Sequence, residues 1–455
     1  MKAREKMKKF IKYSVIILAT FFVTSISILS INAGNQPALQ PWHYMSFAPD
    51  NLTAHKYASF AEYREAERKY LSHIYDTLAK ESKQKFCKYT KGDISSPIIN
   101  GENLNASFEF QPQGEEFKGG VLLLHGLSDS PYHVRKIGRF LSQAGYYVIG
   151  LRLPGHGTVP AALLDIRWQD WYQATVFGAK FVKDRIKKEG KGLFIMGGFS
   201  TGGALTIHYA LKHVLDNGDG LPDKMVFFSP AFGITALAEV TRWHKMISWI
   251  PFFYKLKWQD IEAEYDPFRY GSWPFNAGYQ IYRLANENWE LIDEIATNNK
   301  YLKKIPPMIT FQSRVDATVL PEKVYELYNE IAPNHSELFL FDVNRLLRPI
   351  IKSDILTWNI ESIQGERVKQ MIKIIPDPSS PDTLINKWPK SIYAISHISV
   401  PISPDDIFYG KNSLIGGLNV KGENGVLSTN LNMGRLKYNP YFTFMKNEIL
   451  LFLKK

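Results

Sequence analysis

The sequence predicts an α/β fold built on a mostly parallel, doubly wound sheet. From residue 121 onward, short apolar runs alternate with segments of helical periodicity. Such alternation implies parallel strands joined by right-handed crossovers, with helices on both faces of the sheet. One run leads into Gly198-Phe199-Ser200-Thr201-Gly202, which is typical of a sharp turn between a strand and a helix. The 455 residues are 45% apolar and 22% charged, the composition of a globular protein with a full core.

The excess of positive charge is concentrated at the start of the chain. The net charge is +11, and six of the first twelve residues are Lys or Arg against one Glu. No later basic run is interleaved with the aromatic residues that stack on bases, so we expect no nucleic-acid partner. The single cysteine, Cys87, excludes an internal disulfide and most metal clusters.

Residues 1–34 have the form of an export signal. After the basic start, Tyr13 to Ile31 is nearly all apolar, and no charge follows until Asp50. This run is longer than the roughly 7 to 15 residues of a cleavable signal core and about the minimum for a spanning helix. The small-residue cleavage site at 31–34 is poor. We therefore expect a membrane anchor with the catalytic body outside the cytoplasm, or, if the signal is cleaved, a secreted or periplasmic protein.

Residues 35–115 form an N-terminal extension with one predicted helix. Ser59 and Glu62 have the spacing of a capping box at its start. The apolar residues that follow recur at helical spacing on one face, which we expect to lie against the main body: Phe60, Tyr63, Tyr70, Leu71, Ile74 and Leu78. Residues 90–118 are predicted to be short strands and loops.

The core is predicted in three parts: residues 116–233, 306–343 and 391–455. Its strands are Val121–His125, Tyr146–Leu151, Leu193–Gly197, Met225–Ser229, Met308–Phe311, Glu337–Val343 and a strand-like run at Ser391–Ile395. Its helices are Tyr132–Gln143, Asp165–Lys187, Pro321–Ile331 and Pro440–Leu453.

Two insertions interrupt this core. Residues 234–305 are crowded with aromatic side chains and are interpreted as a lid; a satellite domain with its own aromatic core is compatible with the same pattern. Residues 344–390 mix an amphipathic stretch with a Pro-rich loop, and their role is not readable. No internal repeat is present.

Ser200 is the candidate nucleophile. In a nucleophile elbow the serine sits on a strained turn with its hydroxyl exposed above the sheet. Glycines flank it because the strand and helix backbones pass so close that a Cβ would clash. A free hydroxyl is a poor nucleophile at neutral pH, so Ser200 needs a base, and the base needs an acid to orient it.

The acid and the base are expected on loops at the carboxyl ends of strands, in the chain order Ser, acid, His. Asp316 follows the strand Met308–Phe311 and is the candidate acid, with Asp342 at the end of the next strand as its competitor. Of the histidines beyond Asp316, His335 precedes a strand and so falls on the wrong side of the sheet. His397 follows a strand-like run and is the candidate base, with a structural histidine in a Pro-rich loop as the alternative.

The backbone N–H groups of Thr201 and Leu127 are the candidate oxyanion donors. Thr201 directly follows the nucleophile at the start of a helix, and Leu127 follows the first core strand. His125 and His156 are interpreted as polar groups that brace the oxyanion loop. No carboxylate or histidine neighbour stands at ligand spacing from them, so no metal site and no cofactor is expected.

Four motifs together resemble the α/β-hydrolase superfamily, in its branch of monoacylglycerol lipases, lysophospholipases and serine aminopeptidase-like hydrolases. They are His125-Gly126-Leu127, Pro154-Gly155-His156-Gly157, Gly198-Phe199-Ser200-Thr201-Gly202, and Asp316 with Val319. The resemblance covers residues 116–342 and resumes near 391. It implies Ser200 as nucleophile, Asp316 as acid, His397 as base, and oxyanion amides at Leu127 and Thr201. In the usual family layout the histidine loop closely follows the last core strand, whereas about 50 residues intervene here.

The function expected from the sequence is an exported serine hydrolase that cleaves carboxylic esters of apolar acyl chains through an acyl-enzyme. The aromatic lid favours an ester or lipid substrate, and the N-terminal segment implies the membrane as a partner; no obligate protein partner is readable. Two alternatives stay open: a serine aminopeptidase-like enzyme, which requires an acidic pocket for a free amine, and a non-catalytic binding protein on a hydrolase scaffold.

Overall fold

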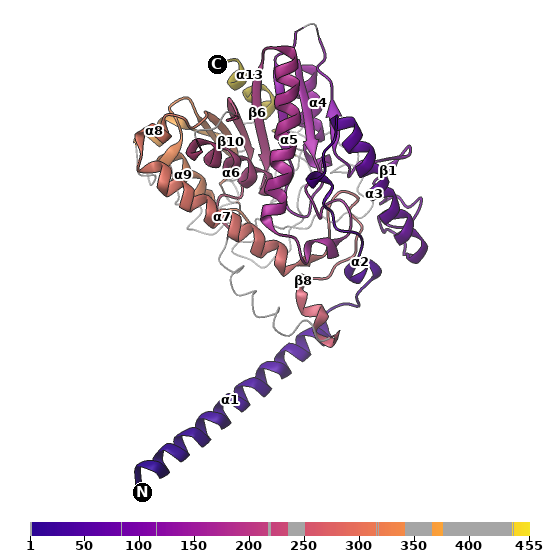
Figure 1. Cartoon of the computed structure of the whole chain (residues 1–455), viewed down its shortest axis with the longest axis vertical. Coiled ribbons are helices and arrows are strands. Elements are labelled where there is room, and N and C mark those ends of the chain that lie inside the picture. Colours follow the sequence, from indigo (N-terminus) through magenta and orange to yellow (C-terminus); the bar gives the residue numbers. More distant parts are fainter. Residues whose placement is uncertain are drawn as a thin grey trace, which may run out of the picture.

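One eight-stranded sheet forms the centre of the molecule (Figure 1). The computed structural model describes residues 2–82, 84–114, 116–216, 220–234, 251–314, 316, 318–341, 366–375, 439 and 441–455. The strand order is β12-β11-β10-β7-β6-β4-β5-β3. Neighbouring strands are parallel except for β3, which pairs with β5 in the antiparallel direction. The predicted α/β class with a mostly parallel sheet is confirmed.

The strands of the sheet are β3 (Phe108–Phe110), β4 (Gly119–Leu124), β5 (Tyr146–Leu151), β6 (Leu193–Phe199), β7 (Lys224–Phe228), β10 (Met308–Ser313), β11 (Glu337–Phe341) and β12 (Ile372–Ile375). Two small hairpins lie outside it, formed by β1 (Ile98–Ile99) with β2 (Glu102–Asn103) and by β8 (Trp258–Asp260) with β9 (Trp273–Pro274). The α-helices are α1 (Lys2–Asn35), α2 (Pro41–Tyr44), α3 (Phe60–Glu81), α4 (Tyr132–Gln143), α5 (Trp168–Glu189), α6 (Thr201–Leu215), α7 (Phe275–Ala296), α8 (Asn299–Leu302), α9 (Pro321–Ile331), α11 (Glu366–Met371) and α13 (Phe442–Lys454). Short 3₁₀ segments are η1 (Leu52–Ala54), η2 (Pro160–Leu163) and η4 (Pro251–Lys257).

Helices cover both faces of the sheet. Helices α4 and α13 pack on one face, where Val121 of β4 and Phe311 of β10 point. The other face is covered by α5, α6, α9 and α11, where Leu122 of β4 and Phe227 of β7 point. Successive strand residues thus bury their side chains on opposite faces, which is why the strands read as continuous apolar runs.

Two strands extend the sheet beyond the predicted core. β3 precedes residue 116 and pairs with β5. β12 comes from the segment interpreted as a second insertion, and it pairs in parallel with β11 through Leu338–Ile372 to Phe341–Ile375. The described part of that insertion therefore continues the sheet. The strand-like run at 391–395 lies outside the described residues.

The N-terminal extension packs against the body through α3, as predicted. The Ser59 hydroxyl caps the helix by accepting the Glu62 N–H at 3.2 Å. The buried positions of α3 are Phe60, Tyr63, Glu67, Leu71, Ile74, Tyr75 and Leu78. Tyr70, predicted for this face, is half-buried and donates its hydroxyl to the Ala48 carbonyl.

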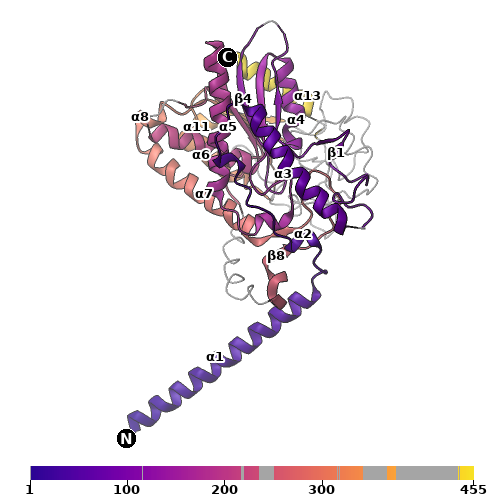
Figure 2. The same ribbon diagram turned by 45° about the vertical axis from the view of Figure 1, so that its right-hand side comes forward.

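Helix α1 projects away from the body (Figures 1 and 2). Among the described residues, no helix has both the length and the apolar character required to cross a membrane. Whether the chain is exported stays a prediction.

The described part of the predicted lid, residues 251–305, divides into two kinds of structure. The loop between β8 and β9 packs near the carboxyl end of β4, where the Tyr270 N–H donates to the Ser128 carbonyl at 2.9 Å. Helix α7 instead packs on α6, α5 and α9, and buries Leu284 and Ile292 in the core. The aromatic composition of the segment did not distinguish these two parts.

Candidate active site

Ser200 lies at the turn between β6 and α6, in a backbone conformation that side chains rarely adopt. Its φ is 51° and its ψ is −113°. A Cβ on Gly198 would lie 2.1 Å from the carbonyl carbon of Gly202, and a Cβ on Gly202 would lie 2.2 Å from the Leu124 carbonyl oxygen. Both glycines are therefore required by the close approach of strand and helix, as the sequence predicted.

Backbone hydrogen bonds hold this strained turn. The Ser200 N–H donates to the Phe228 carbonyl at the end of β7, at 3.0 Å. The Ser200 carbonyl in turn accepts the N–H of Ala231, also at 3.0 Å. The neighbouring strand thus fixes both sides of the residue, and strain of this kind persists only where the surroundings impose it.

The two candidate oxyanion donors lie on either side of the turn. Thr201 is the first residue of α6, where backbone N–H groups have no partner within the helix and the helix dipole favours negative charge. Leu127 lies in the loop after β4, which runs beside β6 in the sheet. The structure therefore brings Leu127, Ser200 and Thr201 together at the carboxyl ends of β4 and β6.

His125 braces the loop that carries Leu127. Its Nε2 accepts the Leu153 N–H at 3.0 Å, which leaves Nδ1 to donate to the Gly126 carbonyl at 2.8 Å. Burial and the neighbouring His156 lower the pKa of His125 well below its usual value. A neutral ring with both nitrogens bonded to backbone groups supports the predicted structural role.

His156, in the loop after β5, is also buried, but only its Nδ1 has a hydrogen-bond partner among the described residues. Its Nδ1 donates to the Pro154 carbonyl at 3.1 Å, and burial lowers the pKa of His156 to about 4. The two imidazole rings lie 5.0 Å apart. Within the described ranges, no three His, Cys, Asp or Glu side chains gather as a metal site requires.

Asp316 lies just beyond the carboxyl end of β10 and is almost fully buried. Its Oδ1 accepts two backbone N–H groups, from Thr318 at 2.9 Å and Val319 at 3.1 Å. These bonds fix the carboxylate at the carboxyl ends of the strands. Ser200 lies at the same end of the sheet, because β10, β7 and β6 are parallel neighbours. The competitor Asp342 lies outside the described residues.

His335 lies at the opposite end of the strands. The residue after it, Ser336, accepts the N–H of Met308, the first residue of β10, at 3.2 Å. This contact places His335 at the amino ends of the strands, as predicted. His397, the candidate base, lies outside the described residues.

A buried arginine behind the Pro154-Gly155-His156-Gly157 loop was not predicted. Arg152 is 1% exposed, and its guanidinium donates to Glu67 Oε1 at 2.8 Å and to the two oxygens of Asp50 at 2.5 and 3.0 Å. It also donates to the His156 carbonyl at 3.0 Å, and Asp50 accepts the Gly155 N–H at 2.8 Å. The N-terminal extension is thereby tied to the loop whose Leu153 N–H binds His125.

The insertion provides a second brace through Tyr270. The Tyr270 hydroxyl donates to the Gly155 carbonyl at 2.9 Å and accepts the Thr158 N–H at 2.8 Å. The backbone N–H of Tyr270 donates to the carbonyl of Ser128, the residue directly after Leu127, at 2.9 Å. One tyrosine therefore connects the insertion to both loops that border the candidate site.

A buried ion pair holds this part of the insertion to the extension. Lys88 pairs with Glu264, and the Lys88 ammonium also donates to the Arg269 carbonyl at 2.8 Å. Glu264 Oε1 accepts the N–H groups of Gly271 and Ser272. The loop that carries Tyr270 is thus fixed at both ends.

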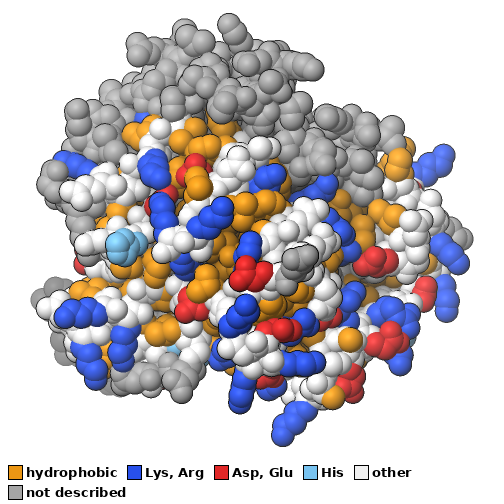
Figure 3. Space-filling view, turned by 90° about the horizontal axis from the view of Figure 1, so that it is seen from above, with side chains coloured by type: hydrophobic (Ala, Val, Ile, Leu, Met, Phe, Trp, Pro, Cys, Tyr) orange, Lys and Arg blue, Asp and Glu red, His pale blue; other side chains and the backbone are white. Residues whose placement is uncertain are grey.

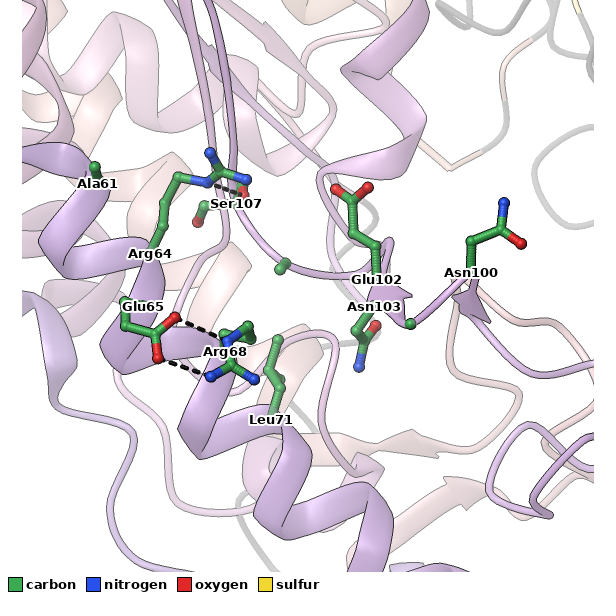
Figure 4. A pocket seen from close by; sticks show the side chains of 11 residues that line it. Ala61, Arg64, Glu65, Arg68, Leu71, Asn100, Glu102, Asn103 and Ser107 are labelled. Carbon is green, nitrogen blue, oxygen red and sulfur yellow. Dashed lines mark hydrogen bonds and ion pairs between the residues drawn. The ribbon is translucent and has the colours of Figure 1, made fainter.

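A separate cavity of about 400 Å³ lies between α3 and the β1–β2 hairpin (Figure 4). Arg64, Glu65, Arg68 and Glu102 supply its charged groups. Arg68 is paired with Glu65 and Arg64 donates to a backbone carbonyl, so these groups are engaged with the protein itself. None of the predicted site residues lines this cavity.

The comparison with protein families decides the classification. The family model described as serine aminopeptidase, S33 matches residues 115–344. This chain belongs to that family. The matched region contains Leu127, Ser200, Thr201 and Asp316, and with it the chain has the α/β-hydrolase fold.

Two curated relatives are similar to this family member over part of its length. A thermostable monoacylglycerol lipase of Bacillus sp. (strain H-257) is 27% identical over 221 residues, which cover 48% of this chain and 79% of the relative. A carboxylesterase of Bacillus subtilis (strain 168) is 33% identical over 99 residues, which cover 21% of this chain and 39% of the relative.

Two solved structures are similar to this chain at lower sequence identity. A monoacylglycerol lipase of Paleococcus ferrophilus is 20% identical, with a TM-score of 0.36, covering 52% of this chain and 87% of its own. A soluble variant of monoglyceride lipase from Saccharomyces cerevisiae is 17% identical, with a TM-score of 0.37, covering 51% of this chain and 81% of its own.

Proposed function

We propose that this family member hydrolyses carboxylic esters of apolar acyl chains through an acyl-enzyme on Ser200. The observation that carries the proposal is the strained backbone of Ser200, held between β6 and α6 with Asp316 on the same edge of the sheet. The two curated relatives, a monoacylglycerol lipase and a carboxylesterase, support ester substrates.

In the proposed reaction, His397 takes the proton of the Ser200 hydroxyl while Oγ attacks the ester carbonyl carbon. The N–H groups of Leu127 and Thr201 stabilise the oxyanion of the tetrahedral intermediate. The alcohol leaves with the proton from His397, and a water molecule, deprotonated by the same histidine, then attacks the acyl-enzyme. Release of the acid returns the proton to Ser200, while Asp316 orients the imidazole.

Elimination among the eleven histidines supports His397 as the base. In the part of the chain that the structure describes, no histidine is hydrogen-bonded to the Ser200 hydroxyl. The two histidines outside that part are His244 and His397. His244 precedes Asp316 in the chain, whereas the order Ser, acid, His of this fold requires the base to follow the acid.

Aminopeptidase activity is the second candidate, because the family model carries that description. Binding a free amine requires an uncompensated acidic group near the nucleophile. Asp129, two residues after Leu127, lies close to the site but has Arg269 at 3.9 Å and His133 at 3.8 Å. The Arg269 guanidinium compensates the charge of Asp129, which favours an ester over an amine.

We further propose that the protein is exported and that α1 keeps it at the membrane, with the catalytic body outside the cytoplasm. The support comes from the sequence alone: a basic start followed by an apolar run without charge until Asp50. A cleaved signal would give a soluble product of lower mass. The mass of the mature N-terminus decides between these forms.

A fluorophosphonate probe tests the catalytic proposal. We expect the wild type to label and Ser200→Ala not to label. Equal labelling of the two, or no labelling of the wild type, would contradict the acyl-enzyme and favour a binding protein on a hydrolase scaffold. His397→Ala should abolish nitrophenyl ester turnover, whereas His335→Ala should not. Turnover of nitrophenyl esters against aminoacyl anilides separates esterase from peptidase activity.

A further inference from the structure

The end of α1 joins the body on the side of the sheet that carries the candidate site. Gln36, which follows α1, donates from Nε2 to the Trp258 carbonyl at 3.0 Å. Trp258 begins β8 of the insertion hairpin, and Tyr270 between the two hairpin strands donates to the Ser128 carbonyl at 2.9 Å. A short series of contacts within one hairpin therefore connects the end of α1 to the loop that carries Leu127.

The chain stays attached to this side after α1 ends. Trp42 is buried, and His43 Nε2 lies 2.8 Å from the hydroxyl of Ser272, the residue before β9. The His43 ring also packs edge-on against Trp258 at 4.9 Å. These contacts fix where α1 leaves the body, whatever direction the helix then takes.

The C-terminal helix marks the opposite side. Lys224, at the start of β7, donates to the Phe452 carbonyl of α13 at 2.8 Å, and Lys455 pairs with Glu337 at the start of β11. Both views show the C-terminus and α1 at opposite ends of the molecule (Figures 1 and 2). Seen from the C-terminal side, the surface carries charges of both signs with apolar side chains scattered between them (Figure 3).

Along its middle section, helix α1 exposes apolar side chains on every side. Its exposed apolar residues in the middle section are Phe10, Ile11, Tyr13, Val15, Ile16, Ile17, Phe21, Phe22 and Val23. Since each residue turns the helix by about 100°, these positions surround it rather than form one stripe. Such a section is stabilised by burial in a protein core or in lipid, and the described elements of the body contact α1 mainly through η4, near the end of the helix. The basic residues before Phe10 complement anionic lipid headgroups.

We propose that α1 inserts into a lipid bilayer. The bilayer then lies against the end of the sheet that carries Ser200, so that the protein binds its ester substrate directly from the lipid. This deepens the proposed function and rests on it. The surface that faces the lipid includes the insertion hairpin and α2, where Tyr44 is 55% exposed. An exposed aromatic side chain at this position suits the boundary between lipid and water.

Fluorescence quenching tests the orientation in the full chain. A fluorophore is attached at Tyr44→Cys or, as the matched control, at Leu451→Cys, each in a Cys87→Ser background. Both positions are half exposed, at 55% and 53%, but they lie at opposite ends of the body. With phosphatidylcholine–phosphatidylglycerol vesicles that contain a doxyl lipid, we expect the label at residue 44 to lose about half of its emission and the label at 451 to lose little. Equal quenching at the two positions, or none at either, overturns the proposal.

A spacer tests the consequence for catalysis. A helical spacer of about 28 residues inserted after Ile31 would move the body about 40 Å from the lipid and leave the contacts of Gln36 in place. We expect hydrolysis of a monoacylglycerol in the vesicles to fall about tenfold, because the site loses its high local substrate concentration. A Gly/Ser spacer of the same length, which lets the body return to the surface, should retain most of this activity.

Turnover of nitrophenyl butyrate in water separates the two proposals. It should be the same in the wild type and both spacer variants, which also shows that the variants are folded. A wild type that lacks this turnover contradicts the ester hydrolysis itself. If turnover is present, two results overturn the bilayer proposal alone: full vesicle activity with the helical spacer, or a wild type that forms oligomers through α1 and does not sediment with vesicles.

Discussion

Replacing Arg152 by Met should destabilise the protein by about 3–5 kcal/mol, because it leaves two buried carboxylates without their cation. Arg152 is 1% exposed, the Glu67 side chain is fully buried and the Asp50 side chain is 6% exposed. Glu67 would retain the hydroxyl of Tyr63 and the N–H and hydroxyl of Ser107 as donors. These neutral donors do not replace a guanidinium. The measurement is the free energy of unfolding in urea at pH 7.5.

A surface pair provides the control. Arg68 and Glu65 are as close as the buried pair, at 2.7 Å, yet their side chains are 62% and 49% exposed. We expect Arg68→Met to change the free energy of unfolding by less than about 0.5 kcal/mol. The double variant Arg152→Met/Glu67→Gln should recover part of the loss, because one uncompensated charge is removed. The reasoning fails if Arg152→Met stays within about 1 kcal/mol of the wild type, or if Arg68→Met destabilises equally.

Three further results are expected. Gly202→Ala should abolish fluorophosphonate labelling, because the new Cβ would lie 2.2 Å from the Leu124 carbonyl oxygen; labelling at the wild-type rate would show that the turn can relax. Burial lowers the pKa of His156 to about 4, so its unfolded form takes up a proton first as the pH falls below about 6.5. The contribution of His156 to the free energy of unfolding is therefore complete above that pH. Between pH 7.5 and 5.5 we expect this contribution to fall by about 1 kcal/mol in urea unfolding, a loss that His156→Gln should lack. Lys88→Met should destabilise more than an exposed lysine variant, because Glu264 is buried and the two side chains are paired; unfolding free energies equal to that of Lys180→Met would contradict this.

Most of the sheet and the position of Ser200 could be predicted from local patterns. The helices α4 and α9 have the bounds that their periodicity indicated. β6 runs on to Phe199, directly before Ser200. These features are local, because strand, turn and helix each depend on residues a few positions apart.

The cluster around Arg152 could not be read in the same way, since its partners lie 85 and 102 residues away in the chain. One signal for it existed. Glu67 falls four residues from both Tyr63 and Leu71, on the face of α3 predicted to be buried. A carboxylate on such a face requires a cation or several hydrogen-bond donors. The position of Glu67 therefore indicated an interaction partner from elsewhere in the fold.

The strand β12 changes how the long segment before His397 is understood. Ser313, Phe341 and Ile375 stand level at the carboxyl ends of β10, β11 and β12. Strand β12 therefore ends at Ile375, at the end of the sheet that carries Ser200. His397 follows 22 residues later in the sequence, the difference between the two residue numbers. In the usual layout of this fold the base follows the last strand beyond the acid. β12 is the last strand among the described residues, and with it the order of the chain and the direction of the sheet both favour His397. His335 lies at the opposite end of the strands and would have to cross the full length of a strand to reach Ser200.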